Sequence, residues 1–344
     1  MADGLHGETM KEIQIQGAKI GDSQPTYFVA EAGLNHNGDL NIAKHLIDEA
    51  FNCGADAIKF QTYKTSEFLT KNSEYLDFFE NVELSYEEFK ELNDYSKNIG
   101  ITFFSAPFDI NSAEFLIKLG VPCFKIASSD LTNHPLIQRV AKTKTPLIIS
   151  TGLSTMKEVE NAVNTCMNEG NNKIILLHCI ANYPTLPNEV NLSSMKTIKK
   201  KFNLPVGFSD NGDSNLVDLV AVSMGANIIE KHFTLDKNFE GPDHSFSIEP
   251  KNLKMLIQQI RQIELMKGDG VKVPQKSEKE NINAIRKSIY ANKEISKGES
   301  LGEENISIKR PAISIQPEFY NEIVGRKVNK NIKIDEPINW QDLA

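Results

Sequence analysis

Glu230 and His232 stand two residues apart in the apolar run 228–232, and they are the first candidates for chemistry in this sequence. Alternate side chains of a β-strand point to the same side, so both groups would enter one cavity if this run is a strand. A carboxylate and an imidazole in one cavity can bind a divalent metal ion or transfer a proton. The structural alternative is a histidine that is only hydrogen-bonded within the core.

Lys59 and Lys125 are each flanked by apolar residues in other runs of this kind. A lysine is rarely buried without a counter-charge. Either Glu31 and Glu230 balance the two ammonium groups inside the protein, or the lysines bind an anionic ligand through a phosphate or carboxylate group. Both interpretations can hold in turn, before and after a ligand binds. Hydroxyl groups that would extend such an anion site lie at or next to the ends of three further runs, at Ser105, Ser128 and Ser209.

Eight short apolar runs that end on polar residues would position these groups, and a stretch with helical periodicity follows each run. The runs end at Glu31, Gln61, Ser105, Ser128, Thr151, Cys179, Asp210 and His232. Apolar bodies with polar ends are typical of parallel strands that are buried on both faces and converge at one rim. Eight such units predict a (β/α)8 (TIM) barrel over residues 27–268, with the active site at that rim. An open doubly wound sheet is the alternative, although no Gly-x-Gly-x-x-Gly motif follows the first run.

The remaining segments lie on either side of the barrel. Residues 1–26 are expected to form an N-terminal extension with a lead-in strand, and Met10 could be an internal start that leaves residues 1–9 as a loose tail. Residues 269–283 are polar and predict a linker. Residues 284–344 predict a small, mostly β domain, because β-like pieces recur at 288–291, 306–310 and 328–332.

Composition excludes several classes of function. The chain has 344 residues and a formal net charge of -8, which argues against nucleic acid as a main partner. Its apolar runs are far shorter than the ~18 residues of a membrane span, and no secretory signal is visible at the start. The four cysteines form no Cys-x-x-Cys pair, so we expect reduced, buried thiols and a cytoplasmic protein.

A set of motifs along the chain resembles the sialic acid synthases and their relatives that make legionaminic and pseudaminic acids. The C-terminal part, with Lys309-Arg310-Pro311, resembles the antifreeze-like (SAF) domain of these enzymes. The motifs that carry the resemblance are Glu31-Ala32-Gly33-Leu34-Asn35-His36-Asn37-Gly38, Lys59-Phe60-Gln61-Thr62, Ser105-Ala106-Pro107-Phe108, Phe124-Lys125-Ile126-Ala127-Ser128, Ser150-Thr151-Gly152, Tyr183-Pro184-Thr185, Ile229-Glu230-Lys231-His232-Phe233 and Gly241-Pro242-Asp243-His244.

The resemblance implies a reaction between phosphoenolpyruvate and an open-chain N-acetylated hexose, such as N-acetylmannosamine or its 6-deoxy diacetamido analogue. The products would be a nine-carbon 2-keto acid and phosphate. The resemblance also implies a divalent metal ion, Mn2+ first with Mg2+ or Co2+ as alternatives, and a domain-swapped homodimer. In that dimer Arg310 of one subunit would meet the sugar in the barrel of the other.

The same resemblance assigns roles residue by residue. Phosphoenolpyruvate would be held by Lys59, Lys125, Ser128 and Ser209. The sugar would be contacted by Gln61, Tyr183, Asp243 and Arg310. The catalytic groups would be Glu31, Glu230 and His232, and the metal ligands would be His232 and Asn211.

Three positions depart from the family pattern. Asn211 stands where a second metal-binding histidine is usual, Ala106 where a threonine is usual, and Ala181 where many relatives carry a polar side chain. Both alanines remove hydrogen bonds available to phosphoenolpyruvate. Two other functions stay open from the residues themselves: an aldolase that uses Lys125 to form a Schiff base, and a non-enzymatic sugar-binding protein built around the C-terminal domain.

Asn211 gives a test that does not depend on turnover. An amide oxygen is a weaker, harder ligand than imidazole, so we predict weaker Mn2+ binding than in relatives with the histidine. Asn211→His should tighten Mn2+ binding, measured by titration of free Mn2+ with the protein. An unchanged affinity would mean that position 211 is not a ligand.

Overall fold

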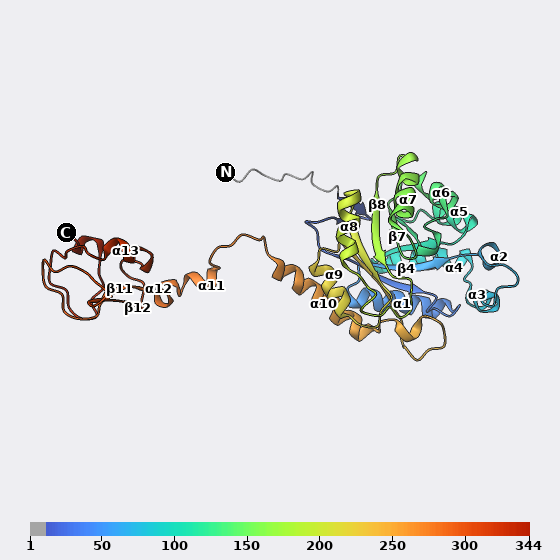
Figure 1. Cartoon of the computed structure of the whole chain (residues 1–344). Coiled ribbons are helices and arrows are strands. Elements are labelled where there is room, and N and C mark those ends of the chain that lie inside the picture. Colours follow the sequence, from blue (N-terminus) through green and yellow to red (C-terminus); the bar gives the residue numbers. More distant parts are fainter. Residues whose placement is uncertain (1–11) are drawn as a thin grey trace. The chain divides into compact units, whose positions relative to one another are not determined.

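The computed structural model describes residues 12–344 and divides into two compact units, residues up to Gly268 and Asp269–Ala344 (Figure 1). The expectations for residues 1–9 lie outside the described range. In residues 12–344, no helix combines the length and the hydrophobicity that crossing a bilayer requires. All four cysteines lie in the first unit, where their thiols are free and buried.

The first unit is a closed barrel of eight parallel strands, in the order β10-β3-β4-β5-β6-β7-β8-β9. The barrel predicted from the eight polar-ended runs is therefore confirmed, and the open sheet is excluded. The strands are β3 (Tyr27–Gly33), β4 (Ala57–Thr62), β5 (Thr102–Pro107), β6 (Phe124–Ile126), β7 (Leu147–Ser150), β8 (Ile174–Cys179), β9 (Val206–Asp210) and β10 (Ile228–His232).

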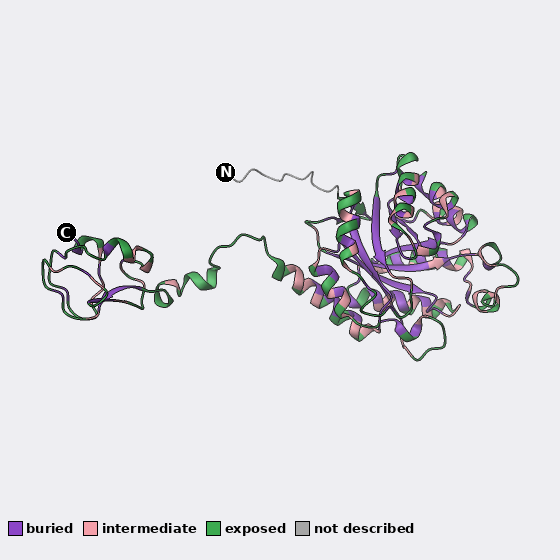
Figure 2. Ribbon diagram, viewed as in Figure 1, coloured by how far each residue is buried: buried purple, intermediate pink, exposed green. Residues whose placement is uncertain are grey.

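Helices surround this barrel, and their buried faces pack on the outer side of the strands (Figure 2). Those that follow the strands are α1 (Leu40–Cys53), α4 (Tyr86–Ile99), α5 (Ile110–Leu119), α6 (His134–Ala141), α7 (Met156–Asn168), α8 (Ser193–Phe202), α9 (Leu216–Ser223) and α10 (Pro250–Lys267). Capping boxes at Ser85 and Thr155 begin α4 and α7, where a side-chain oxygen and a glutamate satisfy free backbone N–H groups. Two short helices, α2 (Thr65–Phe68) and α3 (Leu76–Val82), interrupt the connection from β4 to α4.

The barrel interior changes from apolar to charged along the strand direction. At its amino-terminal end, a hairpin of β1 (Ile13–Ile15) and β2 (Ala18–Ile20) packs its isoleucines against inward side chains that include Ala57 and Ile228. The strand period of two places Lys59 and Gln61 on the same side as Ala57, and Glu230 and His232 on the same side as Ile228. The amino-terminal end of the barrel interior is therefore apolar, and its carboxyl-terminal end is polar and charged.

The second unit has its own hydrophobic core. Strands β11 (Ser288–Ala291) and β12 (Ile306–Lys309) pair antiparallel, as the first two β-like pieces predict. The third expected piece forms only isolated bridges, Val328 with Leu343 and Ile332 with Ile295. The predicted linker contains the one-turn helix α11 (Lys276–Lys279) and leads to α12 (Ile282–Ile285), with α13 (Tyr320–Ile323) further on. Helices α11 and α12 contain no buried residue, and α13 buries Ile323 in the core of the unit.

Gly207 of β9 gives a test of the strand packing. A Cβ at this position would lie 2.3 Å from the carbonyl oxygen of Ile228 on β10. This oxygen belongs to the backbone of a paired strand, so it cannot move away without disturbing the sheet. We predict that Gly207→Ala destabilises the barrel by about 2 kcal/mol or more, seen as a lower denaturation midpoint. Gly100→Ala is the control, because it meets no atom within 4 Å and costs only the strain of its positive φ. Equal effects of the two substitutions would contradict the close packing at Gly207.

Candidate active site

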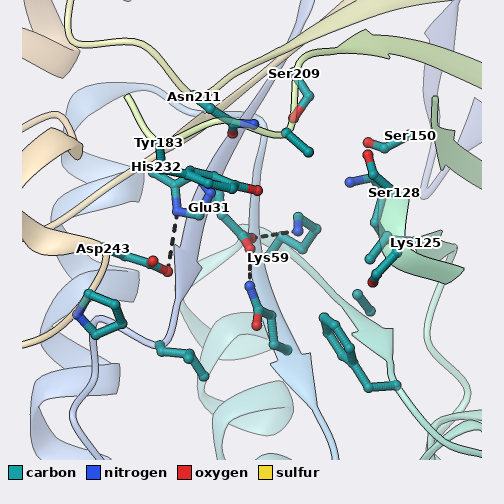
Figure 3. A pocket seen from close by; sticks show the side chains of 18 of the residues that line it. Glu31, Lys59, Lys125, Ser128, Ser150, Tyr183, Ser209, Asn211, His232 and Asp243 are labelled. Carbon is teal, nitrogen blue, oxygen red and sulfur yellow. Dashed lines mark hydrogen bonds and ion pairs between the residues drawn. The ribbon is translucent and has the colours of Figure 1, made fainter. Parts of the chain in front are cut away.

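A cavity of about 1070 Å³ opens at the carboxyl-terminal rim of the barrel (Figure 3). Of the twelve site residues expected from the sequence, eleven line it: Glu31, Lys59, Gln61, Lys125, Ser128, Tyr183, Ser209, Asn211, Glu230, His232 and Asp243. The twelfth, Arg310, is an exposed residue of the second unit, just after β12. The first eleven come from nearly every strand end, so the barrel alone brings them together.

Two lysines and two glutamates form a buried charge network at the base of the cavity. Lys125 Nζ donates to Glu230 Oε1 at 2.7 Å, and Lys59 Nζ lies 3.6 Å from the same oxygen. Lys59 Nζ also lies 2.8 Å from Glu31 Oε2, although without hydrogen-bond geometry. Without a ligand, the lysines are thus balanced internally, which is one of the two interpretations of their burial.

Register explains how these charges meet. Glu31 is directly opposite Lys59 across β3 and β4, and Glu230 is directly opposite Ser209 across β10 and β9. Ser209 Oγ donates to Glu230 Oε1 at 3.1 Å. Glu230 therefore accepts from an ammonium group and a hydroxyl at one oxygen, while its other oxygen has no partner in the described part of the chain.

Burial and mutual attraction set the proton affinities in this network. Burial raises the pKa of Glu230, but the positive charges of Lys125 and Lys59 outweigh burial and hold the pKa at about 2. Burial dominates at Lys125, whose pKa is lowered, and at Glu31, whose pKa is raised. For Lys59 the attraction of Glu230 and Glu31 overcomes burial and raises the pKa. The site thus keeps Glu230 ionised and holds Lys125 closer to neutrality than a free lysine.

Hydroxyl groups extend the network toward β6 and β7. Ser128 begins the 3-10 turn η1 (Ser128–Asp130), and its Oγ accepts from the Gly152 N–H at 3.1 Å. Ser150 ends β7, lines the cavity, and has a buried hydroxyl with no partner in residues 12–344. Ser150 was not among the expected site residues, although it lies at the end of an apolar run as Ser128 and Ser209 do.

Ser105 corrects one expectation. It was grouped with the anion-binding hydroxyls, but it does not line the cavity. Its Oγ donates to the Phe60 carbonyl at 2.9 Å and shares a hydrogen bond with Thr62 Oγ at 2.7 Å. The inward positions of β5 are Phe104 and Ala106, so Ser105 points to the outer face of the barrel.

His232 ends β10 and lies near Asp243, and Asn211 directly follows the neighbouring strand β9. His232 Nδ1 is buried and lies 3.6 Å from Asp243 Oδ2 (Figure 3), and it has no hydrogen-bond partner among residues 12–344. Burial lowers the pKa of His232, so the ring is neutral and able to act as a ligand. Asn211 Nδ2 donates to the Ile180 carbonyl at 2.8 Å, which leaves its amide oxygen available.

The donors beside His232 could supply part of the coordination shell of a divalent cation. Within the described range, no group of three or more His, Cys, Asp and Glu side chains is arranged to hold a metal alone. One imidazole nitrogen without a partner and one amide oxygen supply only part of a coordination shell. Water and ligand oxygens would have to complete it.

A second buried ion cluster lies behind the rim and fixes the Asn211 loop. Lys231 points away from the cavity, pairs with Asp210, and lies 3.2 Å from Asp218 Oδ2 of α9. Its Nζ also donates to the Gly212 carbonyl at 3.1 Å. Lys231 therefore holds the backbone beside Asn211 to the strand that carries Glu230 and His232.

Hydrogen bonds from the loop after β3 hold the loop that carries Asp243 in place. Asn35 Nδ2 donates to the Phe233 carbonyl at 2.8 Å and to Ser247 Oγ at 2.9 Å. Asn37 Nδ2 donates to the Glu240 carbonyl at 3.0 Å. Through these bonds the two asparagines connect segments about 200 positions apart in sequence.

Comparison with known proteins identifies related sequences and folds. The NeuB family model matches residues 46–272, and the SAF domain model matches residues 286–344. The chain is 49% identical to an uncharacterized protein of Methanocaldococcus jannaschii, over 97% of this chain and 99% of that protein. It is 45% identical to the N,N'-diacetyllegionaminic acid synthase of Campylobacter jejuni, over 91% and 98%. The crystal structure of an N-acetylneuraminic acid synthetase from Leptospira borgpetersenii matches with a TM-score of 0.76 and 39% identity, covering 80% of this chain and 97% of that one.

Glu230→Gln tests the charge network. The substitution leaves two buried ammonium groups with one carboxylate, so we predict a loss of about 3 kcal/mol in barrel stability at pH 7. Because folding lowers the pKa of Glu230 from 4.5 to about 2, its ionised form contributes stability above pH 4.5, and that contribution is lost as pH falls toward 2. The difference in free energy of unfolding between parent and variant should therefore become smaller as the pH falls from 4.5 to about 2. Denaturant midpoints measured at each pH give this difference. A gap that stays constant down to pH 2 would contradict the pairing.

Proposed function

The chain belongs to the NeuB family, and on that premise we propose that it is a sialic-acid-type (nonulosonate) synthase. It would condense phosphoenolpyruvate with an open-chain N-acetylated hexose to a nine-carbon 2-keto acid and release phosphate. The observation that carries this proposal is the pair of buried lysines, Lys59 and Lys125, in a rim cavity that also contains hydroxyl groups and an unpartnered imidazole.

Phosphoenolpyruvate would bind at the lysine side of the cavity. Its phosphate and carboxylate would compete with Glu31 and Glu230 for Lys59 and Lys125, and accept from the hydroxyls of Ser128, Ser209 and Ser150. Ala106 and Ala181 also line the cavity and offer no hydrogen bond. Binding of phosphoenolpyruvate, which carries about three negative charges at neutral pH, would therefore depend chiefly on charge and should weaken as salt is added.

The sugar would lie between Gln61, Tyr183 and Asp243, with its aldehyde carbon facing the enol carbon of phosphoenolpyruvate. A new carbon–carbon bond forms between these two atoms, and positive charge develops at the carbon that bears the phosphate. Glu230, kept ionised by its low pKa, stabilises that charge. Water then adds at this carbon, and phosphate leaves to give the keto group.

A divalent metal ion, Mn2+ before Mg2+ or Co2+, would polarise the aldehyde oxygen. His232 and Asn211 are the residues of this chain that would hold it. Asp243, 3.6 Å from His232, would orient the ring and accept from a sugar hydroxyl. Glu31, whose pKa burial raises, is suited to donate or accept the proton of the new hydroxyl.

Three further properties belong to the proposal. The legionaminic acid synthase and the neuraminic acid synthetase above are named for their products. The acceptor of this chain would accordingly be either an N,N'-diacetylated 6-deoxy sugar or N-acetylmannosamine. Arg310 would complete the site from the SAF domain of a second subunit, in a domain-swapped homodimer. The location would be the cytoplasm, where phosphoenolpyruvate is made.

A Schiff-base aldolase is the second candidate, since burial lowers the pKa of Lys125 as an amine nucleophile requires. The ion pair of Lys125 with Glu230 at 2.7 Å opposes this function, because it favours the charged ammonium form. Borohydride trapping with a keto acid separates the two candidates, because only the aldolase forms a covalent adduct on Lys125.

Phosphate release is the direct assay of the proposed function. We predict release from phosphoenolpyruvate only when both Mn2+ and an N-acetylated hexose are present, with loss of activity on chelation that Mn2+ restores. Lys125→Met should lower kcat/KM by about 100-fold or more, because an interaction with a charged group is removed at the reacting centre. No phosphate release with any of the sugars, or a borohydride adduct, would overturn the synthase proposal.

A further inference from the structure

Asp243 reaches the cavity from a loop, residues 234–247, and not from a strand end. Within this Asp243 loop lies the short 3-10 turn η2 (His244–Phe246). The Asp243 carboxylate is nevertheless closely placed, because a Cβ on Gly33 would lie 3.2 Å from its Oδ2. Contacts of side chains must therefore hold the loop in this position.

The His244 side chain is fully buried and has a partner at each ring nitrogen. Nδ1 lies 2.7 Å from the Thr234 hydroxyl oxygen, at the start of the same loop. Nε2 lies 3.2 Å from Asn37 Oδ1, in the loop after β3 and 207 positions earlier in the sequence. The ring therefore ties the Asp243 loop both to its own beginning and to a distant segment.

The partners of Asn37 determine which ring nitrogen carries the hydrogen. Asn37 Nδ2 donates to the Glu240 carbonyl, so the amide oxygen faces His244 Nε2 and can only accept. Nε2 therefore donates, and Nδ1 of the neutral ring accepts from the Thr234 hydroxyl. Burial lowers the pKa of His244, which keeps the ring neutral. A reversed amide would set its oxygen against the Glu240 carbonyl, two acceptors with no hydrogen between them.

Close packing on both sides of Asp243 completes the arrangement. A Cβ on Gly241 would lie 2.8 Å from His244 Cδ2 and 3.2 Å from Asn37 Oδ1, so the chain before Asp243 lies directly against the two side chains. After Asp243, the Ser247 hydroxyl donates to the Asp243 carbonyl at 2.6 Å. The direction in which the carboxylate points is thus set by its neighbours, and His244 is central among them.

We propose that His244 is a positioning residue for the sugar-binding side: its Nε2–H orients the Asn37 amide, which in turn holds Asp243 toward the substrate. The inference rests on the proposed function, in which Asp243 contacts the sugar while Lys59 and Lys125 hold phosphoenolpyruvate. The lysines lie on β4 and β6 and not on either loop. Loss of the Nε2 bond should therefore weaken sugar binding alone, by the about 3- to 10-fold that one hydrogen bond is worth.

Two substitutions that differ by one methylene group test this bond. The amide of His244→Asn ends near the position of Nδ1 and cannot reach Asn37, whereas that of His244→Gln extends to the position of Nε2 and can still donate. The substrate is N-acetylmannosamine or its 6-deoxy diacetamido analogue, whichever the parent uses. In phosphate-release assays, His244→Asn should raise KM for the sugar about 3- to 10-fold and leave KM for phosphoenolpyruvate unchanged. His244→Gln should restore most of the parent value.

The matched control is His134→Asn, which alters a histidine whose Nδ1 lies 2.9 Å from the Thr165 hydroxyl, between α6 and α7. It should change neither KM. In an Asp243→Ala background, His244→Asn should raise the sugar KM no further, because the group that it positions is gone. Additive effects, equal changes in both KM values, or an unchanged sugar KM in folded His244→Asn would each overturn the proposal.

Two further measurements keep the outcome decisive. If His244→Asn does not fold, Asn37→Gly removes the same bond from the other side, suits the positive φ of position 37, and should give the same change in KM. If the parent releases no phosphate, the proposed function is overturned, and hydrogen exchange then decides the role of His244. His244→Asn should speed exchange of the amides in residues 236–247, and His244→Gln should not. Equal exchange in both variants would contradict it.

Discussion

The need to neutralise four charges inside a barrel governs this structure. Lys59, Lys125, Glu31 and Glu230 are nearly fully buried, and each would be very costly alone. Strand register pairs them, and the apolar hairpin plug below prevents water from reaching them from the other end. The network is balanced without a ligand. An incoming anion can therefore exchange with the carboxylates as partner of the two ammonium groups, and the site is stable before the anion binds.

The rim divides into regions because different elements build each one. Strand ends supply the charged base, the loop after β10 supplies Asp243, and the α2–α3 segment supplies the apolar side of the cavity. Contacts between loops coordinate these parts: Asn35 and Asn37 hold the Asp243 loop, and Lys231 holds the Asn211 loop. The charged base of the cavity and its apolar side therefore come from different elements of the fold.

Much of the barrel could be predicted from the sequence, because a buried parallel strand that ends on Glu, Lys or Ser leaves a clear pattern. The side of the strand toward which each residue points could not be predicted. Phe103, Phe104 and Ser105 give no sign of which side is inward, since both faces of the strand are buried, and so Ser105 was misplaced. Ser150 was missed even though it lies at the end of an apolar run, because a buried hydroxyl, unlike a buried charge, does not require a charged partner. The apolar side of the cavity left no signal at all, because Phe78, Phe79 and Val82 resemble core residues until the fold shows that they border a cavity.

The most direct test of the central claim follows the oxygen that bridges carbon and phosphorus in phosphoenolpyruvate. With 18O at this position, one turnover with an N-acetylated hexose is analysed by mass spectrometry of both products. Attack by the enol carbon followed by water addition breaks the carbon–oxygen bond, so the account predicts that the label leaves in inorganic phosphate. Label retained in the keto group of the nine-carbon acid would mean cleavage at phosphorus, and would contradict the chemistry assigned to the rim.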